Sequence, residues 1–240
     1  SWTDNGNLNN AALSVLLKDG ESYYVSVRAV DQVGNASEVS SSDGVMADFM
    51  PPSIIEVSVE EGSLLSVLSD ARIYFTISEP IIFASAKVES RQGDTVKDSL
   101  ILFDQSKAVK VTTKLVSVKV NRFTSGDKIT INIGGLTDLA GNVTNNQIFV
   151  YDVSLLGDYD LDGDISIMDL NTFINGWNTG DTSLELGPTL GTVPNLKPQI
   201  NGSYDIYDAM AFTRMWHWNT NKLSKQQTKI IADQGTSLNA

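Results

Sequence analysis

An alternating acidic run at residues 158–163 constrains the fold more than any other stretch of this sequence. Asp158, Asp160 and Asp162 are each separated by one residue, and Gly163 follows directly. When a backbone curls around a point, alternate side chains turn inward, and glycine permits the sharp turn that this requires. The run therefore predicts a compact, acidic loop.

The residues that follow complete the ligand pattern of an EF-hand-type calcium loop. Calcium takes six to eight oxygen ligands at about 2.3–2.6 Å, and a twelve-residue loop supplies them from positions 1, 3, 5, 7, 9 and 12. The residues at those six positions are Asp158, Asp160, Asp162, Asp164, Ser166 and Asp169. Asp164 would contribute its backbone carbonyl and Ser166 would act through water, while the apolar Ile165 at position 8 anchors the loop. We predict calcium as the cofactor; the alternatives are magnesium, which prefers a smaller octahedral shell, and a solvated acidic turn without a metal.

A helix is expected directly after this loop, and the same pattern returns once more. Leu170, Phe173, Ile174 and Trp177 recur at helical spacing. An offset of 39 residues aligns Ile206, Asp208, Phe212 and Trp216 with Ile167, Asp169, Phe173 and Trp177. The chain therefore contains two related loop–helix units.

The second unit departs from the calcium pattern. Its candidate ligands are Asn201, Ser203, Asp205 and Asp208, with Gly202 at the turn position. The same alignment places Lys197 and Gln199 at positions 1 and 3, where the first unit has carboxylates. A lysine ammonium at position 1 repels a cation and can pair with Asp208 instead. We therefore expect the second loop to bind metal weakly or not at all.

Two such units over residues 154–220 resemble a dockerin module. The stretches Glu185–Pro188 and Met215–Trp218 are similar to the variant dockerin-like modules of very large bacterial surface proteins. The connector, residues 178–196, is longer than that family usually has. The resemblance implies calcium binding and attachment to a cohesin-like domain of the same or another chain.

In dockerins, loop positions 10 and 11 and the adjoining helix face make the contact with the partner. At position 11, Met168 and Tyr207 are the candidates for partner contact in this chain. At position 10, we expect Ile167 and Ile206 to pack in the core of the module itself.

Residues 48–153 show strand-like runs and no helical period. Strands are expected at Ile54–Val59, Ile73–Ile77, Val109–Val111, Leu115–Val120, Ile129–Ile133 and Gln147–Tyr151. Pro51 and Pro52 mark the boundary before them, because proline cannot donate to a strand ladder. The stretches Ser78–Pro80 and Gly135–Asn142 resemble bacterial Ig-like domains of surface-layer and cell-wall proteins, which implies one complete β-sandwich.

Residues 1–47 contain strands and turns but fewer residues than a sandwich needs. Leu17–Tyr23 resembles the corner of a fibronectin type III domain, where a tyrosine hydroxyl ties a strand to the preceding loop. The resemblance covers only the second half of such a domain, so its first half would be missing or supplied by another chain.

A short motif, Asp-x-x-Gly-Asn, occurs at residues 31–35 and again at residues 138–142. One interpretation is a metal or ligand loop. The favoured interpretation is a repeated turn, in which aspartate caps the turn, glycine takes a positive φ and asparagine tolerates left-handed geometry.

The expected fold class is therefore mainly β, with a small α-helical module built on EF-hand-type loops. The expected parts are a partial fibronectin III-like sandwich at 1–47, an Ig-like sandwich at 48–153 and the dockerin-like module at 154–220. Residues 221–240 would be a tail or the start of a further domain, with a strand at Thr228–Ala232.

Composition and charge argue against several classes of function. The formal net charge of −12 argues against a nucleic-acid partner, and the absence of cysteine excludes disulfides and thiolate chemistry. No apolar run reaches the roughly 18 residues of a membrane span. The single histidine, His217, has no visible nucleophile partner, so neither an enzyme nor a small-molecule substrate is expected.

We therefore expect a non-catalytic segment of a secreted modular protein, extracellular or on a bacterial cell surface, that attaches to a cohesin-like partner. Two alternatives remain. The segment is a purely structural stalk stiffened by calcium, or it is the non-catalytic tail of a secreted polysaccharide hydrolase.

Overall fold

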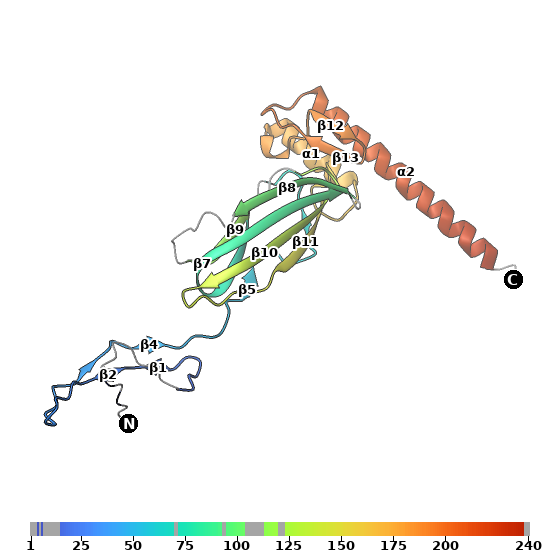
Figure 1. Ribbon diagram of the computed structural model, residues 1–240. Helices are drawn as coiled ribbons and strands as arrows, with labels where there is room; N and C mark the ends of the chain where they lie inside the picture. The colour runs from blue at the N-terminus through green and yellow to red at the C-terminus, as the bar shows by residue number, and fades with distance from the viewer. Residues whose placement is uncertain are drawn as a thin grey trace.

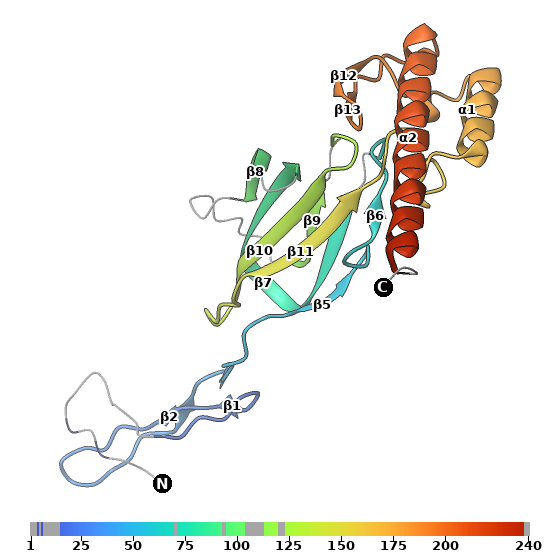
Figure 2. The ribbon, with the colours of Figure 1, turned by 90° about the vertical axis from the view of Figure 1, so that its right-hand side faces the viewer.

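The computed structural model describes residues 4, 6, 15–69, 72–92, 95–103, 113–119 and 123–237. Three parts follow one another along the chain: an N-terminal segment of short strands, a seven-stranded sheet and a C-terminal part with two α-helices (Figure 1, Figure 2). The protein is mainly β with a C-terminal helical part, as expected. Within the described residues, no helix combines the length and the apolar character needed to cross a membrane.

The central part is a seven-stranded mixed sheet. Its strands are β5 (Ile54–Val57), β6 (Leu64–Leu65), β7 (Arg72–Gln92), β8 (Thr95–Phe103), β9 (Thr113–Lys119), β10 (Lys128–Asp138) and β11 (Gln147–Val153). The main order is β5-β7-β10-β11-β6, and β8 and β9 also pair with β7. The β11–β6 pair is parallel, and the other pairs are antiparallel.

Strand β7 organises the sheet because it changes partners along its length. Its first half lies between β5 and β9, and its second half lies between β8 and β10. The pairing with β9 shifts register across Pro80, which has no N–H to donate. Alternate residues of the first half, Ile73, Phe75 and Ile77, are fully buried. These apolar side chains, packed with those of β10, form the centre of the core.

The predicted strands are found where the structure describes them, but the sheet contains more strand than was predicted. The predicted strand at Val109–Val111 lies outside the described residues. Strand β7 is far longer than the predicted Ile73–Ile77, and β6 and β8 were not predicted.

The N-terminal segment forms two small antiparallel ladders. The strands are β1 (Ser22–Tyr23), β2 (Ser26–Val27), β3 (Ser40–Ser41) and β4 (Val45–Met46), and the pairs are β1–β4 and β2–β3. The tyrosine corner expected from the sequence is present: Lys18 N–H donates to the Tyr23 hydroxyl at 2.8 Å. Large apolar residues such as Leu16, Val33 and Val45 are exposed here.

The repeated Asp-x-x-Gly-Asn motif is a repeated turn. The Asp31 carboxylate accepts the Asn35 backbone and side-chain N–H groups, both at 2.8 Å. The Asp138 carboxylate accepts the same two groups of Asn142 at 2.9 Å. The glycines take positive φ, as expected, but the asparagines do not; each instead uses its side-chain amide to hold the aspartate.

The C-terminal part contains α1 (Ile167–Thr179), a 3-10 turn (Thr182–Leu184), a hairpin of β12 (Thr189–Thr192) and β13 (Asn195–Pro198), and α2 (Ile206–Ser237). Ser166 caps the start of α1, and Gly180, at φ 70°, ends it. Helix α2 extends well beyond α1 (Figure 1). The strand predicted at Thr228–Ala232 is wrong, because these residues continue α2.

The hairpin β12–β13 ties the helical part to the sheet. Ser125 N–H, in the loop before β10, donates to the Leu196 carbonyl at 2.9 Å. The Asn195 side chain donates back to the Ser125 carbonyl at 3.0 Å. Leu196 is fully buried and joins one continuous apolar core with residues of the sheet and of both helices. From the sequence, residues 178–196 are expected only to be a long connector.

Candidate metal centre

The acidic loop lies between β11 and α1, where its sequence position predicted it. Asp158, Asp160 and Asp162 each place a carboxylate oxygen within 4.8 Å of the others. Asp160 Oδ1 accepts the Asp162 N–H at 3.3 Å, and Asp162 Oδ1 accepts the Asp164 N–H at 2.9 Å. These turns, together with Gly163 at φ 91°, curl the backbone so that the three carboxylates converge.

Asp158 is the buried member of this group, with a residue exposure of 3%. Its Oδ2 accepts the Gly163 N–H at 3.2 Å, but its Oδ1 is buried without a hydrogen-bond partner. Burial, helped by the nearby Asp169 and Asp162 charges and opposed by backbone hydrogen bonds from Gly163 and Leu161, raises the pKa of Asp158 to about 6. A buried polar atom without a partner costs about 1–3 kcal/mol. A hard cation would satisfy that oxygen and offset the repulsion, so these residues fit calcium.

The structure gives Asp169 and Ser166 additional roles that sequence spacing did not reveal. Asp169 is fully buried; its Oδ1 accepts the Tyr159 N–H at 2.7 Å, and its Oδ2 accepts the Ser166 N–H at 2.8 Å. The Ser166 hydroxyl accepts the Met168 N–H at 3.1 Å, which completes a capping box at the start of α1. Asp169 therefore holds the loop closed beside the three converging carboxylates rather than among them.

Ile165 anchors the loop as expected. Its side chain is buried, and its carbonyl accepts the Asn219 side chain of α2 at 3.3 Å. The aromatic stack between the helices lies beyond it: Phe173 and Phe212 have ring centroids 5.0 Å apart. The two loop–helix units aligned in the sequence therefore pack against each other.

The second loop is built around a residue that the sequence alignment missed. Glu185, fully buried, accepts the Asn201 N–H at 2.5 Å through Oε1 and the Gly202 N–H at 2.8 Å through Oε2. The predicted position-1 residue, Lys197, instead lies exposed in β13, where it pairs with Leu190 of β12. The hairpin separates Glu185 from the rest of its loop, so a fixed offset could not find it.

The other candidate residues of the second loop all take part in its hydrogen bonds. Asp208 is fully buried; its Oδ1 accepts the Leu186 and Gly187 N–H groups, both at 2.8 Å, and its Oδ2 accepts the Asp205 N–H at 2.7 Å. Two further bonds are local: Asp205 Oδ1 accepts the Tyr207 N–H, and Asn201 Oδ1 accepts the Ser203 N–H. These residues do not form a second carboxylate cluster among the acidic groups that the structure describes.

A pair of exposed apolar residues follows each loop; the two pairs lie toward opposite ends of the helix pair, because Ile165 before α1 contacts Asn219 of α2, whereas Trp177 near the end of α1 contacts Tyr204 before α2. Ile167 and Met168 of α1 are 59% and 62% exposed, and Ile206 and Tyr207 of α2 are 64% and 54% exposed. The expectation that Ile167 and Ile206 pack in the core is wrong, because Phe173 and Phe212, further along the helices, fill the space between them. All four residues at loop positions 10 and 11 therefore face outward.

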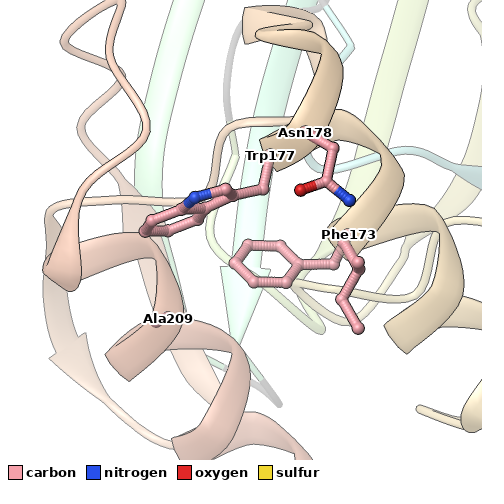
Figure 3. Close-up of a pocket in the computed structure, with 5 residues that line it drawn as sticks. Phe173, Trp177, Asn178 and Ala209 are labelled. Carbon is pink, nitrogen blue, oxygen red and sulfur yellow. The ribbon is translucent and has the colours of Figure 1, made fainter.

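A shallow apolar cavity of about 280 Å³ opens between the two helices (Figure 3). It is lined by Phe173, Ile174, Trp177 and Asn178 of α1 and by Ala209 of α2. The rings of Phe173 and Trp177 form its wall, with centroids 6.0 Å apart. The cavity lies on the same helix pair as the exposed apolar residues.

A further acidic group lies at the other end of the sheet. Asp48, Glu79 and Asp138 bring carboxylate oxygens within 4.8 Å of one another. Burial raises the pKa of Glu79, and the charges of Asp48 and Asp138 raise it further. The Asp138 carboxylate is held by Asn142, as part of the repeated turn.

No protein-family model and no curated protein matches the chain. Among solved structures, the chain is weakly similar to the crystal structure of an engineered protein, with 19% sequence identity and a TM-score of 0.24. The aligned region covers 46% of this chain and 21% of that chain, so it spans about a fifth of the other protein. A similarity this weak carries no argument about fold or function.

Proposed function

We propose that residues 154–220 form a calcium-binding, dockerin-like module in a non-catalytic segment of a secreted modular protein. In this proposal, calcium binds the first loop through Asp158, Asp160 and Asp162, with Asp164, Ser166 and Asp169 completing or supporting the site. The sheet and the N-terminal segment act as Ig-like and fibronectin III-like spacers. The module attaches the protein to a cohesin-like partner.

One observation carries the metal assignment. Three carboxylates converge within 4.8 Å, and the buried one, Asp158, has an oxygen without any hydrogen-bond partner. An acidic surface turn would place its charges in water and leave no buried oxygen unsatisfied. The oxygen-only donor set favours a hard cation, and the loop spacing favours calcium over magnesium.

The exposed apolar residues support attachment. Met168 and Tyr207, predicted as contact residues from the dockerin resemblance, are both exposed, together with Ile167 and Ile206. Interfaces are centred on apolar and aromatic side chains that lose contact with water on binding. The apolar cavity beside Trp177 adds a depression that a partner side chain can fill.

Calorimetric titration of the full chain with calcium tests the metal assignment. The wild type should show a tight site that Asp158→Ala removes. Asp152→Ala, which removes an exposed carboxylate of β11 outside the loop, is the matched control and should leave binding unchanged. Undiminished binding by the Asp158 variant would contradict the assignment.

A second candidate function, a calcium-stiffened joint in a stalk, is favoured by a different observation. The hairpin β12–β13 is hydrogen-bonded to the loop before β10 through Ser125, Asn195 and Leu196. Such a contact fixes the module against the sheet without any partner. Pull-down with a panel of cohesin domains, with and without calcium, discriminates the two: calcium-dependent capture that Met168→Asp abolishes supports attachment.

A further inference from the structure

The two loops of the helical part use the same hydrogen-bond scheme. In each loop, a carboxylate where the loop begins accepts the backbone N–H of the turn glycine. A buried aspartate in the first turn of the following helix accepts the backbone N–H of the residue three positions before that aspartate. The corresponding pairs are Asp158 with Glu185, Gly163 with Gly202, and Asp169 with Asp208. Glu185 is therefore the structural counterpart of Asp158, although the hairpin separates it from the remainder of its loop.

The two counterparts differ in how well their oxygens are satisfied. Both oxygens of Glu185 accept backbone N–H groups of the same loop, from Asn201 and Gly202. Asp158 accepts the Gly163 N–H through Oδ2, and its Oδ1 is buried without a partner. The glutamate side chain is one methylene longer, so its carboxylate reaches two successive N–H groups across the loop.

The buried charge of the second loop is balanced by backbone donors. Glu185 accepts two N–H groups, and Asp208 accepts three, from Leu186, Gly187 and Asp205. Hydrogen bonds from backbone N–H groups to a carboxylate are strong. Asp208 also lies in the first turn of α2, where the helix dipole favours a negative charge.

We infer that the Glu185 carboxylate, and not a metal ion, holds the second loop, so that the module takes one calcium ion. The two halves then respond differently to calcium removal. The first loop and the start of α1 depend on the ion, whereas the second loop, the hairpin and the start of α2 keep their structure. This inference rests on the proposed calcium site in the first loop.

The consequence concerns the two exposed apolar pairs. Ile167 and Met168 follow the calcium-dependent loop, and Ile206 and Tyr207 follow the Glu185-held loop. Calcium would therefore order one of these two exposed apolar pairs, Ile167 and Met168, while the other pair stays permanently formed.

Hydrogen exchange of the full chain, with calcium and with EDTA, tests the inference without any substitution. On chelation, exchange of the Gly163 amide should accelerate about tenfold or more, because its acceptor, Asp158, loses the ion that fixes its carboxylate. Exchange of the Asn201 and Gly202 amides should change less than about twofold. Equal acceleration at both loops would overturn the inference.

The variant Glu185→Gln provides a second test of the inference, with Asp160→Asn as its matched control. Glu185→Gln should accelerate exchange at Asn201 and Gly202 while calcium binding keeps its one-ion stoichiometry. Asp160→Asn should weaken calcium binding and leave those two amides protected. A second calcium ion that still binds after Glu79→Gln, which disables the other acidic group, would overturn the one-ion inference alone, whereas no calcium binding by the wild type would overturn the proposed site as well.

Discussion

Phe173 of α1 stacks on Phe212 of α2, with ring centroids 5.0 Å apart and ring planes inclined by 16°. Both rings are largely buried, and they are equivalent residues of the two loop–helix units. Because each helix rests on the other through this pair, neither half of the module can bury its apolar face alone.

This stack leads to a stability prediction. Phe212→Ala should lower the free energy of unfolding of the helical part by about 3–5 kcal/mol, since it removes buried area and leaves a cavity. Met210→Ala, an exposed position on the same helix, should change it by less than about 0.5 kcal/mol. Denaturant unfolding monitored by the helical circular dichroism signal measures both. If Phe212→Ala changed the free energy of unfolding as little as Met210→Ala, the Phe212 ring would not belong to the core of the helical part.

The hairpin that joins the module to the sheet gives a second prediction. Leu196→Ala should destabilise the protein by about 2–5 kcal/mol, because the side chain is fully buried where the hairpin meets the sheet. Leu190→Ala, on the exposed side of the same hairpin, should be nearly neutral. Calorimetric melting should show the module and the sheet separating into distinct transitions in the Leu196 variant only. A single unchanged transition would contradict a hairpin that couples them.

Calcium removal should weaken the module far more than the sheet. Three converging carboxylates repel one another without a cation, and a ligand that binds only the folded state stabilises it by about 2.7 kcal/mol at a hundredfold excess over its dissociation constant. EDTA should therefore lower the melting temperature of the helical signal, and added calcium should restore it. A melting curve indifferent to EDTA would mean that the loop is not a structural calcium site.

Proton competition at Asp158 gives a pH prediction. Burial raises the pKa of Asp158 from its ordinary 3.8 to about 6 in the metal-free protein. The folded chain then keeps a proton that the unfolded chain has released, so stability without metal should fall as pH rises from about 4 to about 6. Calcium must displace this proton, so its dissociation constant should be about tenfold weaker near pH 5 than near pH 7.

The control for this prediction is Glu79→Gln. The pKa of Glu79 is also raised, but it lies in the other acidic group, remote in sequence from the loop. Calcium titrations of this variant at both pH values should keep the full pH dependence. A dissociation constant that is unaffected by pH in the wild type would exclude Asp158 as a buried ligand.

The sequence predicted the structure best where the residues of a feature lie close together along the chain. Asp158, Asp160 and Asp162 converge because each is within a few residues of the next, and the Asp31 and Asp138 turns were predictable for the same reason. Local hydrogen bonds and glycine conformations determine such features, so no knowledge of the distant chain is needed.

The sequence failed where distant segments decide the outcome. Glu185 takes its place in the second loop only because a hairpin leaves the loop and returns, which a fixed alignment offset cannot represent. The exposure of Ile167 and Ile206 depends on the Phe173–Phe212 stack filling the space between the helices. The length of β7 depends on its successive pairing partners rather than on its own apolar alternation.

The position of the calcium ion in a crystal is the most direct test of the proposed metal site. Crystals of the full chain grown with calcium should show one strong anomalous peak, in contact with carboxylate oxygens of Asp158, Asp160 and Asp162, and none at Glu185. The absence of a peak at the first loop, with calcium in excess, would contradict the account.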